Sequence, residues 1–405
     1  MSSGAPLPTP AEATARILAR LPALPVETRP LAALTGAVLA QDVYAERDQP
    51  PFDRVTMDGV AFASARYAAG ARRFRIAGVQ AAGRPPLDLP QGDVCFEVMT
   101  GAILPGGCDC VVPVERIKVM EDAVELPADL AIEPGMNVHA RGLDARAGAR
   151  LLGQGTRLGA PELAVLASAG LPHARVRAEP RIMIVTTGDE LIEPGLPIEA
   201  WQVRRSNAHA MRAALAMRGF GRTGQDHLPD DPAEMRARLA RHLDTHDVLV
   251  LTGGVSMGRF DHVPAVMVEL GVTQHLHRIA QRPGLPLWFV VAGRGQAVFG
   301  LPGNPVSALV CLLRYVVPGM LAASGAAVPD PEQIRLGAEF QVRPSLTFFL
   351  PVRLEARPGL GSVAVPSPTH GSGDFVSLLG THGFVELPPG PAIYPAGHAA
   401  PFYRW

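Results

Sequence analysis

A chain of 405 residues, of which 47% are hydrophobic and 19% charged, is long enough to fold into about two to four domains. Its formal net charge of −1 excludes the basic surface that nucleic-acid binding requires, so no nucleic-acid partner is expected. The longest apolar run, residues 308–321, contains Arg314 and Pro318, and therefore predicts no membrane span. Prolines at positions 6, 8 and 10 break any signal-peptide pattern, so we expect a cytoplasmic location.

The four cysteines fit a reduced compartment and predict no metal site. Cys108 and Cys110 have the wrong spacing for a zinc ligand pair, and no second pair completes a site. We interpret them as incidental thiols.

The first expected element is a helix that begins with a capping box. Thr9-Pro-Ala-Glu12 places a cap residue, a first-turn proline and a glutamate at the positions that open a helix, which should run to about Leu21. From about Gln41 to Arg141, short β-like pieces alternate with Gly/Pro turns and predict a separate β-rich domain. A helical pattern returns at 160–169, and β-like runs after about Pro331 predict a small β domain at the end.

Between about residues 179 and 325, strands alternate with helices, a pattern that predicts a parallel sheet covered on both faces. Ser206-Asn207 is expected to cap one of these helices, and Asp231-Pro232 opens another. Three apolar strands each run into a polar, Gly-containing loop; these strands are 181–185, 247–251 and 297–300. Ligands bind beyond the carboxyl ends of parallel strands, and free backbone N–H groups there form a cradle for a phosphate.

Several motifs, in this order, resemble the molybdopterin molybdenumtransferase family, which includes bacterial MoeA and the carboxyl-terminal domain of gephyrin. The matching segments are Pro50–Phe62 (PPFDRVTMDGVAF), Met99–Val112 (MTGAILPGGCDCVV), Thr187–Leu191 (TGDEL), Gly253–Gly258 (GGVSMG) with Asp261, and Gly300–Ala308 (GLPGNPVSA). Together they span most of the chain.

The resemblance implies an α/β multidomain fold of four parts. These are an elongated, discontinuous helical domain (1–45 plus 142–178), a β-rich insert (46–141), a parallel-sheet αβ domain of the molybdopterin-binding type (179–326) and a carboxyl-terminal β barrel (327–405). It also implies a homodimer whose cleft joins the αβ domain of one subunit to the insert of the other.

The implied reaction consumes molybdate and adenylylated molybdopterin, inserts molybdenum into the dithiolene and releases AMP, with Mg²⁺ assisting. The upstream partner is then a molybdopterin adenylyltransferase, and the downstream partners are molybdoenzyme apoproteins or carriers. On this resemblance the catalytic candidates are Asp58, Thr100, Asp144, Glu190, Asp231 and Asp261, of which Asp231 and Asp261 bind the metal. The candidates that bind the pterin nucleotide are Thr187, Gly188, Asp189, Gly253, Gly254, Ser256, Gly258, Pro286, Pro302, Gly303 and Asn304.

Several of these residues also have a purely structural interpretation. Asp58 with Gly59 can form a tight turn, and Glu190 can complement a helix dipole as a first-turn acid. Asp231 before Pro232 is a sufficient helix cap, and its neighbour Asp230 could bind the metal instead.

Molybdate, a tetrahedral dianion, requires cationic and hydroxyl donors. Relatives carry a Lys-Pro-Gly-Lys-Pro segment where this chain reads Arg282-Pro-Gly-Leu-Pro286, so Arg282 keeps a charge and Leu285 does not. Ser307 and Ser372 are the further candidate molybdate donors.

Two alternatives stay open, the first motivated by Leu285 and the second by the αβ domain, which such enzymes share. The first is a paralog that binds the pterin nucleotide as a scaffold or carrier without inserting metal, and the second is a pterin adenylyltransferase or nucleotide hydrolase on the same fold.

Overall fold

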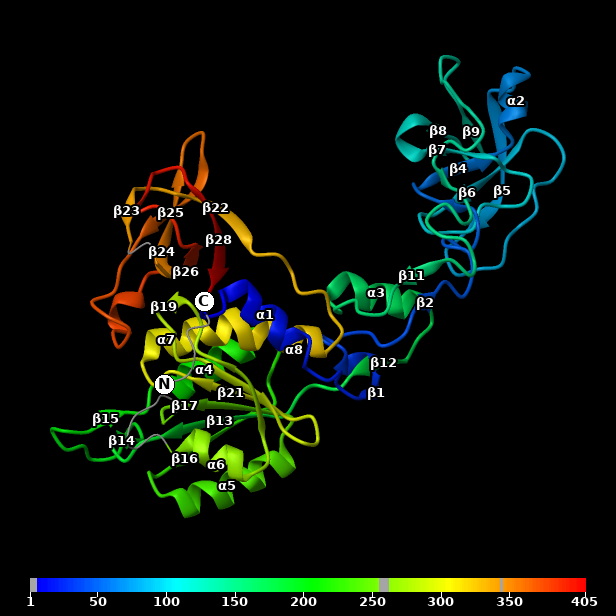
Figure 1. Cartoon of the computed structure of the whole chain (residues 1–405). Helices are drawn as coiled ribbons and strands as arrows, with labels where there is room; N and C mark the ends of the chain where they lie inside the picture. Colours follow the sequence, from blue (N-terminus) through cyan, green and yellow to red (C-terminus); the bar gives the residue numbers. More distant parts are fainter. Residues whose placement is uncertain (1–5, 255–261, 343–344) are drawn as a thin grey trace.

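The computed structural model describes residues 6–254, 262–342 and 345–405. Figure 1 shows an αβ unit with the carboxyl-terminal β barrel beside it, and a β-rich insert held away from both at the end of a narrow connecting part.

The αβ unit is built on a six-stranded sheet with the order β16-β13-β17-β21-β20-β18. The first four strands are parallel to one another; β20 then pairs antiparallel with β21, and β18 pairs antiparallel with β20. Every residue of β17 and β21 is buried, because helices cover both faces of the sheet at its centre. The strand bounds are β13 Ile182–Thr187, β16 Thr223–Leu228, β17 Val248–Thr252, β18 Thr273–His277, β20 Trp288–Val291 and β21 Ala297–Leu301.

Two hydrophobic clusters occupy the two faces of this sheet. One cluster joins the sheet to α1, α4, α7 and α8, and the other joins it to α5 and α6. This is the doubly covered parallel sheet that the alternating pattern predicts. The helices are α1 Pro10–Leu18, α4 Asn207–Ala216, α5 Pro232–Thr245, α6 Val263–Glu269, α7 Pro305–Cys311 and α8 Val317–Ala323.

Helix α1 begins with the predicted capping box: Thr9 N–H donates to Glu12 Oε2 at 2.8 Å, and Glu12 N–H donates to Thr9 Oγ1 at 3.3 Å. Its buried residues Ala13 and Ile17, four positions apart, lie on one face of the helix. That face packs against α8 and β18. The first helix therefore packs on the αβ core. The family resemblance, by contrast, groups residues 1–45 with residues 142–178 in one elongated domain.

Helices α7 and α8 are joined by a π-helical turn, Leu312–Val316, into one continuous helix. Among the described residues, this segment, Pro305–Ala323, is the one helix whose length and composition would suffice to cross a membrane. However, 78% of its most apolar window is buried inside the molecule. It also carries the buried Arg314, whose Nε donates to Glu386 of the barrel at 2.8 Å. The helix is thus a core element of the αβ unit.

The insert is a six-stranded sheet with the order β7-β4-β6-β5-β9-β8, accompanied by the short helix α2, Ser64–Ala68. Its strands are β4 Gly59–Phe62, β5 Arg73–Gln80, β6 Val94–Val98, β7 Cys110–Pro113, β8 Lys118–Val119 and β9 Ala123–Glu125. Cys95, Cys108 and Cys110 are free and buried here, and burial raises the pKa of each thiol to about 12.

The connecting part contains α3, Ala160–Ser168, and three two-stranded ladders. Each ladder pairs a strand from before or at the start of the insert with one from its end or after it. The pairs are β1 Val26–Pro30 with β12 His173–Arg177, β2 Val43–Tyr44 with β11 Arg150–Leu152, and β3 Arg54–Val55 with β10 Val138–His139.

The carboxyl-terminal sheet closes on itself because β24 pairs with both β25 and β26, which makes it a barrel. Its first strand comes from the αβ unit: β19, Gln281–Arg282, pairs with the start of β24. The other strands are β22 Glu332–Leu336, β24 Thr347–Arg357, β25 Gly361–Pro366, β26 Gly383–Leu387 and β28 Ala399–Arg404. Two short ladders complete the strands, β14 Leu191–Ile192 with β15 Val203–Arg204, and β23 Phe340–Gln341 with β27 Ile393–Tyr394.

Candidate functional site

The carboxyl ends of β13, β17 and β21 meet at one edge of the αβ sheet, as the parallel order predicts. The hydroxyl of Thr252, at the end of β17, donates to the carbonyl of Pro302, after β21, at 3.0 Å. The side-chain amide of Asn207, the first residue of α4, donates to the Gly303 carbonyl at 2.8 Å and to Thr252 Oγ1 at 3.1 Å. One asparagine thus holds two of the strand exits together.

The third exit, at Thr187, lies so close to the β17 loop that only glycine fits there. Gly253 has φ +90°, and a Cβ on it would lie 2.6 Å from the Thr187 carbonyl oxygen. A Cβ on Gly254 would lie 2.7 Å from Thr187 Oγ1. Thr187 is 3% exposed, and its hydroxyl has no hydrogen-bond partner among the described residues. The glycines therefore allow two backbone segments to touch at the mouth of the sheet.

These exits enclose a cavity of about 440 Å³, which we call the strand-exit cleft. Glu190 borders it, and so does Gly373 from the barrel. The lining residues are Thr186, Thr187, Glu190, Leu191, Val203, Arg204, Arg205, Ser206, Asn207, Thr252, Gly253, Gly303, Asn304, Pro305 and Gly373.

Carboxylates gather beside the cleft, where β13 and β16 end. Asp230 N–H donates to Asp189 Oδ1 at 3.1 Å, which brings the loops after these two strands together. Asp231 caps α5, with its Oδ1 accepting from Glu234 N–H at 2.8 Å. The structural interpretation of Asp231 as a cap is therefore correct for one of its oxygens, and the residue is exposed. Gly188 precedes Asp189 and is buried with φ +127°.

A second cavity, of about 580 Å³, lies between the αβ unit and the barrel; we call it the barrel pocket. Its wall holds Arg282 from β19 and His370 from a barrel loop, together with the hydroxyls of Ser307, Thr369 and Ser372. No aspartate or glutamate lines it among the described residues. Pro286, Pro302 and Leu285 also border this pocket. A pocket with cationic and hydroxyl donors and no acid has the chemistry to hold an oxyanion.

The two cavities share Gly303 and Asn304. At this boundary Asn304 Nδ2 donates to Ser372 Oγ at 2.8 Å, and Val306 N–H donates to the Ser372 carbonyl at 2.9 Å. The start of α7 and the barrel loop are thereby locked together. A ligand that extends across the boundary at Gly303 and Asn304 would occupy both cavities.

The candidates from the insert and from the segment directly after it form two small clusters of their own. Thr100 donates to Asp58 Oδ1 twice, from its N–H and its hydroxyl, each at 2.6 Å. These hydrogen bonds lower the pKa of Asp58, so the exposed carboxylate is ionised. Asp144 is bonded to His139 Nε2 at 2.9 Å. Figure 1 places the insert far from the strand exits of the same chain, so these residues do not join the site within one subunit.

Three sequence candidates, Ser256, Gly258 and Asp261, lie outside the described residues.

Three residues that border the cavities were not proposed from the sequence as ligand-binding. Asn207 was expected only to cap a helix, although its amide bridges the strand exits. Arg205 borders the strand-exit cleft and pairs with Glu193, and its buried Nε has no partner among the described residues. His370 follows no motif, and only the folding of the barrel loop onto α7 brings it to the barrel pocket.

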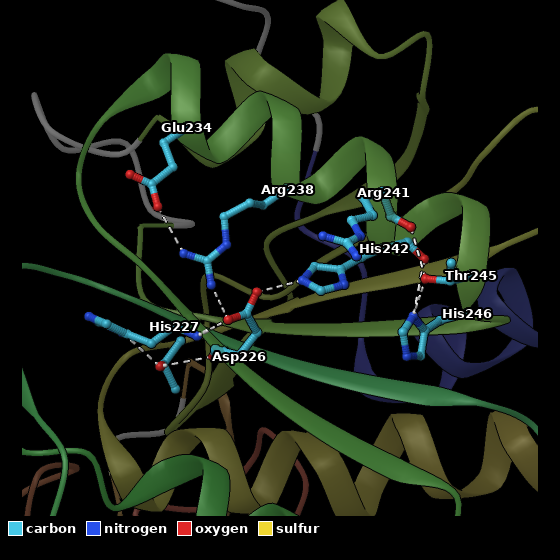
Figure 2. Close-up of polar contacts among 9 residues, drawn as sticks. Asp226, His227, Glu234, Arg238, Arg241, His242, Thr245 and His246 are labelled. Atoms are coloured by element: carbon cyan, nitrogen blue, oxygen red, sulfur yellow. Dashed lines mark hydrogen bonds and ion pairs between the residues drawn. The ribbon is translucent and has the colours of Figure 1, made fainter.

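Next to the cleft, β16 and α5 are joined by a network of charged side chains (Figure 2). Asp226 pairs with Arg238 and accepts from His242 Nε2 at 2.6 Å, while Arg238 also pairs with Glu234 at 2.9 Å. His227 Nδ1 lies 3.0 Å from Thr186 Oγ1. Because these charges are paired with one another, we interpret the network as the support that positions α5 and its capped start beside the cleft.

A doubly wound αβ domain with glycine-rich strand exits, joined by a shared cleft to a β barrel and carrying a β-rich insert, defines a multidomain ligand-binding protein. Family models cover most of the chain: "MoeA N-terminal region (domain I and II)" matches residues 8–170, "Probable molybdopterin binding domain" matches 183–322, and "MoeA C-terminal region (domain IV)" matches 333–405. The chain belongs to the molybdopterin molybdenumtransferase (MoeA) family, a family of transferases of molybdenum cofactor biosynthesis.

Individual relatives agree over nearly the whole length. A molybdopterin molybdenumtransferase of Synechocystis is 40% identical over 91% of this chain and 93% of that protein. One of Synechococcus elongatus is 33% identical, with 94% of each chain covered. The crystal structure of a molybdopterin biosynthesis MoeA protein from Pyrococcus horikoshii OT3 superposes with a TM-score of 0.82 at 25% identity, covering 99% of this chain and 100% of that one. The family and the multidomain α/β fold expected from the motifs are thus confirmed.

Proposed function

We propose that this protein inserts molybdenum into adenylylated molybdopterin, consuming molybdate and releasing AMP. The observation that carries the proposal is the meeting of two chemically different cavities at Gly303 and Asn304. One has the glycine-rich strand exits that suit a phosphate, and the other has the acid-free donors that suit an oxyanion. A substrate that carries a pyrophosphate and receives an oxometalate needs both, side by side.

The strand-exit cleft would hold the pyrophosphate of the nucleotide. The φ +90° of Gly253 and its contact with Thr187 bring backbone to the cleft surface without a side chain in between. Backbone N–H groups in such a turn bind phosphoryl oxygens. Asn207, which ties Thr252 to Gly303, fixes the shape of this wall before the substrate arrives.

The barrel pocket would hold molybdate. Arg282 is exposed to the pocket, and no carboxylate among the described residues pairs with its guanidinium, so its N–H groups are free to grip an oxyanion. Ser372 Oγ accepts from Asn304, which leaves its own proton to donate to a ligand oxygen. Molybdate would then lie next to the boundary where the substrate enters from the strand-exit cleft.

A magnesium ion would be held by carboxylates at the ends of β13 and β16. Magnesium in phosphate sites takes one or two carboxylates, with water and phosphate oxygens completing its shell. Asp231 would supply one, and Asp261, outside the described residues, the other; Asp230 and Asp189 lie next to Asp231. When bound, the ion neutralises charge that develops on the phosphoryl oxygens as the anhydride breaks. Glu190, exposed at the cleft, would orient water or ligand there.

We further propose a homodimer in which the insert of one subunit completes the cleft of the other. The ionised Asp58, held by Thr100 on the insert, and Asp144, directly after the insert, are exposed far from the strand exits of their own chain (Figure 1). They can reach a strand-exit cleft only if it belongs to a second copy. The four free, buried cysteines agree with a reduced, cytoplasmic setting, where an adenylyltransferase would supply the substrate and apoenzymes or carriers would take the product.

The decisive experiment mixes the pure protein with adenylylated molybdopterin, magnesium and increasing molybdate, and measures AMP. Molybdate-dependent AMP release is the expected result. Tight binding of the pterin nucleotide without turnover would instead support the scaffold alternative, and AMP release that ignores molybdate would support the hydrolase alternative.

A further inference from the structure

We propose that His370 supplies the second positive charge of the barrel pocket, in the place that Leu285 leaves neutral. The inference rests on the proposed function, because it assigns a role toward molybdate. It names a residue that determines how this chain binds the oxyanion, and no motif of the sequence points to it.

The first observation is which side chains form the wall of the pocket. Among the described residues that line it, the ionisable side chains are Arg282 and His370. The segment 302–307 contributes proline, glycine, asparagine, valine and serine, and β24 contributes only apolar residues. A dianion in this pocket would therefore meet one permanent charge and one imidazole.

The loop that carries His370 is held in place from two sides. Ser372 is fixed to the start of α7 through Asn304 and Val306. On the other side, His370 N–H donates to Asp374 Oδ2 at 3.2 Å, and Asp374 also accepts from Ser377 N–H at 3.1 Å. These hydrogen bonds hold the loop backbone at His370 and at Ser372, and so fix the part of the loop that borders the pocket.

A bound dianion attracts positive charge, and the two ionisable side chains among the described residues of the wall, Arg282 and His370, are the groups that can supply it. Asp374 belongs to the same loop, and the hydrogen bonds from Ser377 and His370 N–H, together with the nearby imidazole, lower its pKa, so it is ionised. A dianion between Arg282 and His370 would be stabilised by a positive charge on both side chains.

Leu285 borders the same pocket, and so it offers a test of charge alone. A lysine at 285 would restore a permanent cation to the pocket without involving the barrel loop. If His370 acts through its charge, Leu285→Lys should compensate for its loss.

The experiment measures the molybdate KM of AMP release for four full-length proteins: wild type, His370→Gln, Leu285→Lys/His370→Gln, and His173→Gln as a matched control at an exposed position of β12. We expect His370→Gln to raise the molybdate KM about tenfold, as the loss of one charge-assisted contact does. The KM for the pterin nucleotide should stay unchanged, the double variant should recover to within about threefold of wild type, and the control should match wild type.

The pH dependence provides a second readout. Because an imidazole generally loses its charge between about pH 5 and 8, the wild-type molybdate KM should rise over that range, whereas the double variant should show a flatter profile. An unchanged KM in His370→Gln, with wild type active, would overturn this inference and leave the proposed function standing. A wild type that releases no AMP in response to molybdate would overturn both.

Discussion

Asn304 and Ser372 join two domains at the point where the two cavities meet. The side-chain amide of Asn304, directly before α7, donates to the hydroxyl of Ser372 on a barrel loop at 2.8 Å. Both residues border the barrel pocket, and Asn304 also borders the strand-exit cleft. The barrel is therefore part of the site, because it provides one wall of the cavity in which the oxyanion would bind.

Replacing Ser372 with alanine tests this wall. The variant keeps the backbone bond from Val306 N–H to the carbonyl of residue 372 and removes only the hydroxyl. We expect the molybdate KM to rise about tenfold, with little change in the KM of the pterin nucleotide. Ser362→Ala, on an exposed position of β25, is the matched control and should behave as wild type. Equal effects of the two variants would contradict a donor role for Ser372.

Gly253→Ala tests the close approach at the strand exits. The new Cβ would lie 2.6 Å from the Thr187 carbonyl oxygen, on a backbone with φ +90°. We expect a loss of about 2–4 kcal/mol in unfolding free energy, from left-handed strain and overpacking combined, with loss of turnover. Gly271→Ala separates these two costs, because Gly271 has φ +76° and a Cβ there meets nothing within 4 Å. That control should lose about 1 kcal/mol and keep its activity. The comparison uses the urea midpoint together with AMP release.

The sequence predicts the parts of this site that local chemistry dictates. Apolar strands followed by glycine-rich loops place the exits of β13, β17 and β21 at one edge, and the capping box places the start of α1. The pocket between the domains could not be predicted in this way. Strand β19 is two residues long, and its partner residues on β24 come 66 positions later in the chain, as with Gln281 and Thr347. Asn207 has the sequence pattern of a helix cap, but its amide bonds lead to residues 252 and 303, so tertiary contacts decide its role.

Asp231→Ser distinguishes a cap from a metal ligand. Serine is as good a cap as aspartate, so α5 should begin at the same residue. The free energy of unfolding should then change by less than about 0.5 kcal/mol. One oxygen of Asp231 already accepts from Glu234 N–H, and the other forms no hydrogen bond with the described residues. We expect magnesium-dependent turnover to fall at least about tenfold and the magnesium concentration for half-maximal activity to rise. Unchanged magnesium dependence would leave Asp231 as a cap and direct attention to Asp230 and Asp189.

The network on β16 predicts a defined pH dependence of stability (Figure 2). Burial alone would raise the pKa of Asp226, but the hydrogen bonds from His242 and His227 N–H and the charge of Arg238 outweigh it, so the pKa is lowered. A carboxylate with a lowered folded-state pKa stabilises the fold above its unfolded pKa of about 3.9, and this contribution is lost as the pH falls through the folded value.

Asp226→Asn should therefore cost about 1–3 kcal/mol at pH 7, because it weakens a charged, half-buried hydrogen-bond network. The difference from wild type should shrink as the pH falls below about 4, where wild-type Asp226 itself becomes protonated. Asp244→Asn is the matched control, since Asp244 also pairs with an arginine but its side chain is 63% exposed, and it should change stability by less than about 1 kcal/mol at any pH. Urea midpoints measured from pH 7 down to pH 3 test this prediction. A difference in stability between Asp226→Asn and wild type that stays constant with pH would show that the carboxylate charge does not hold α5 to β16.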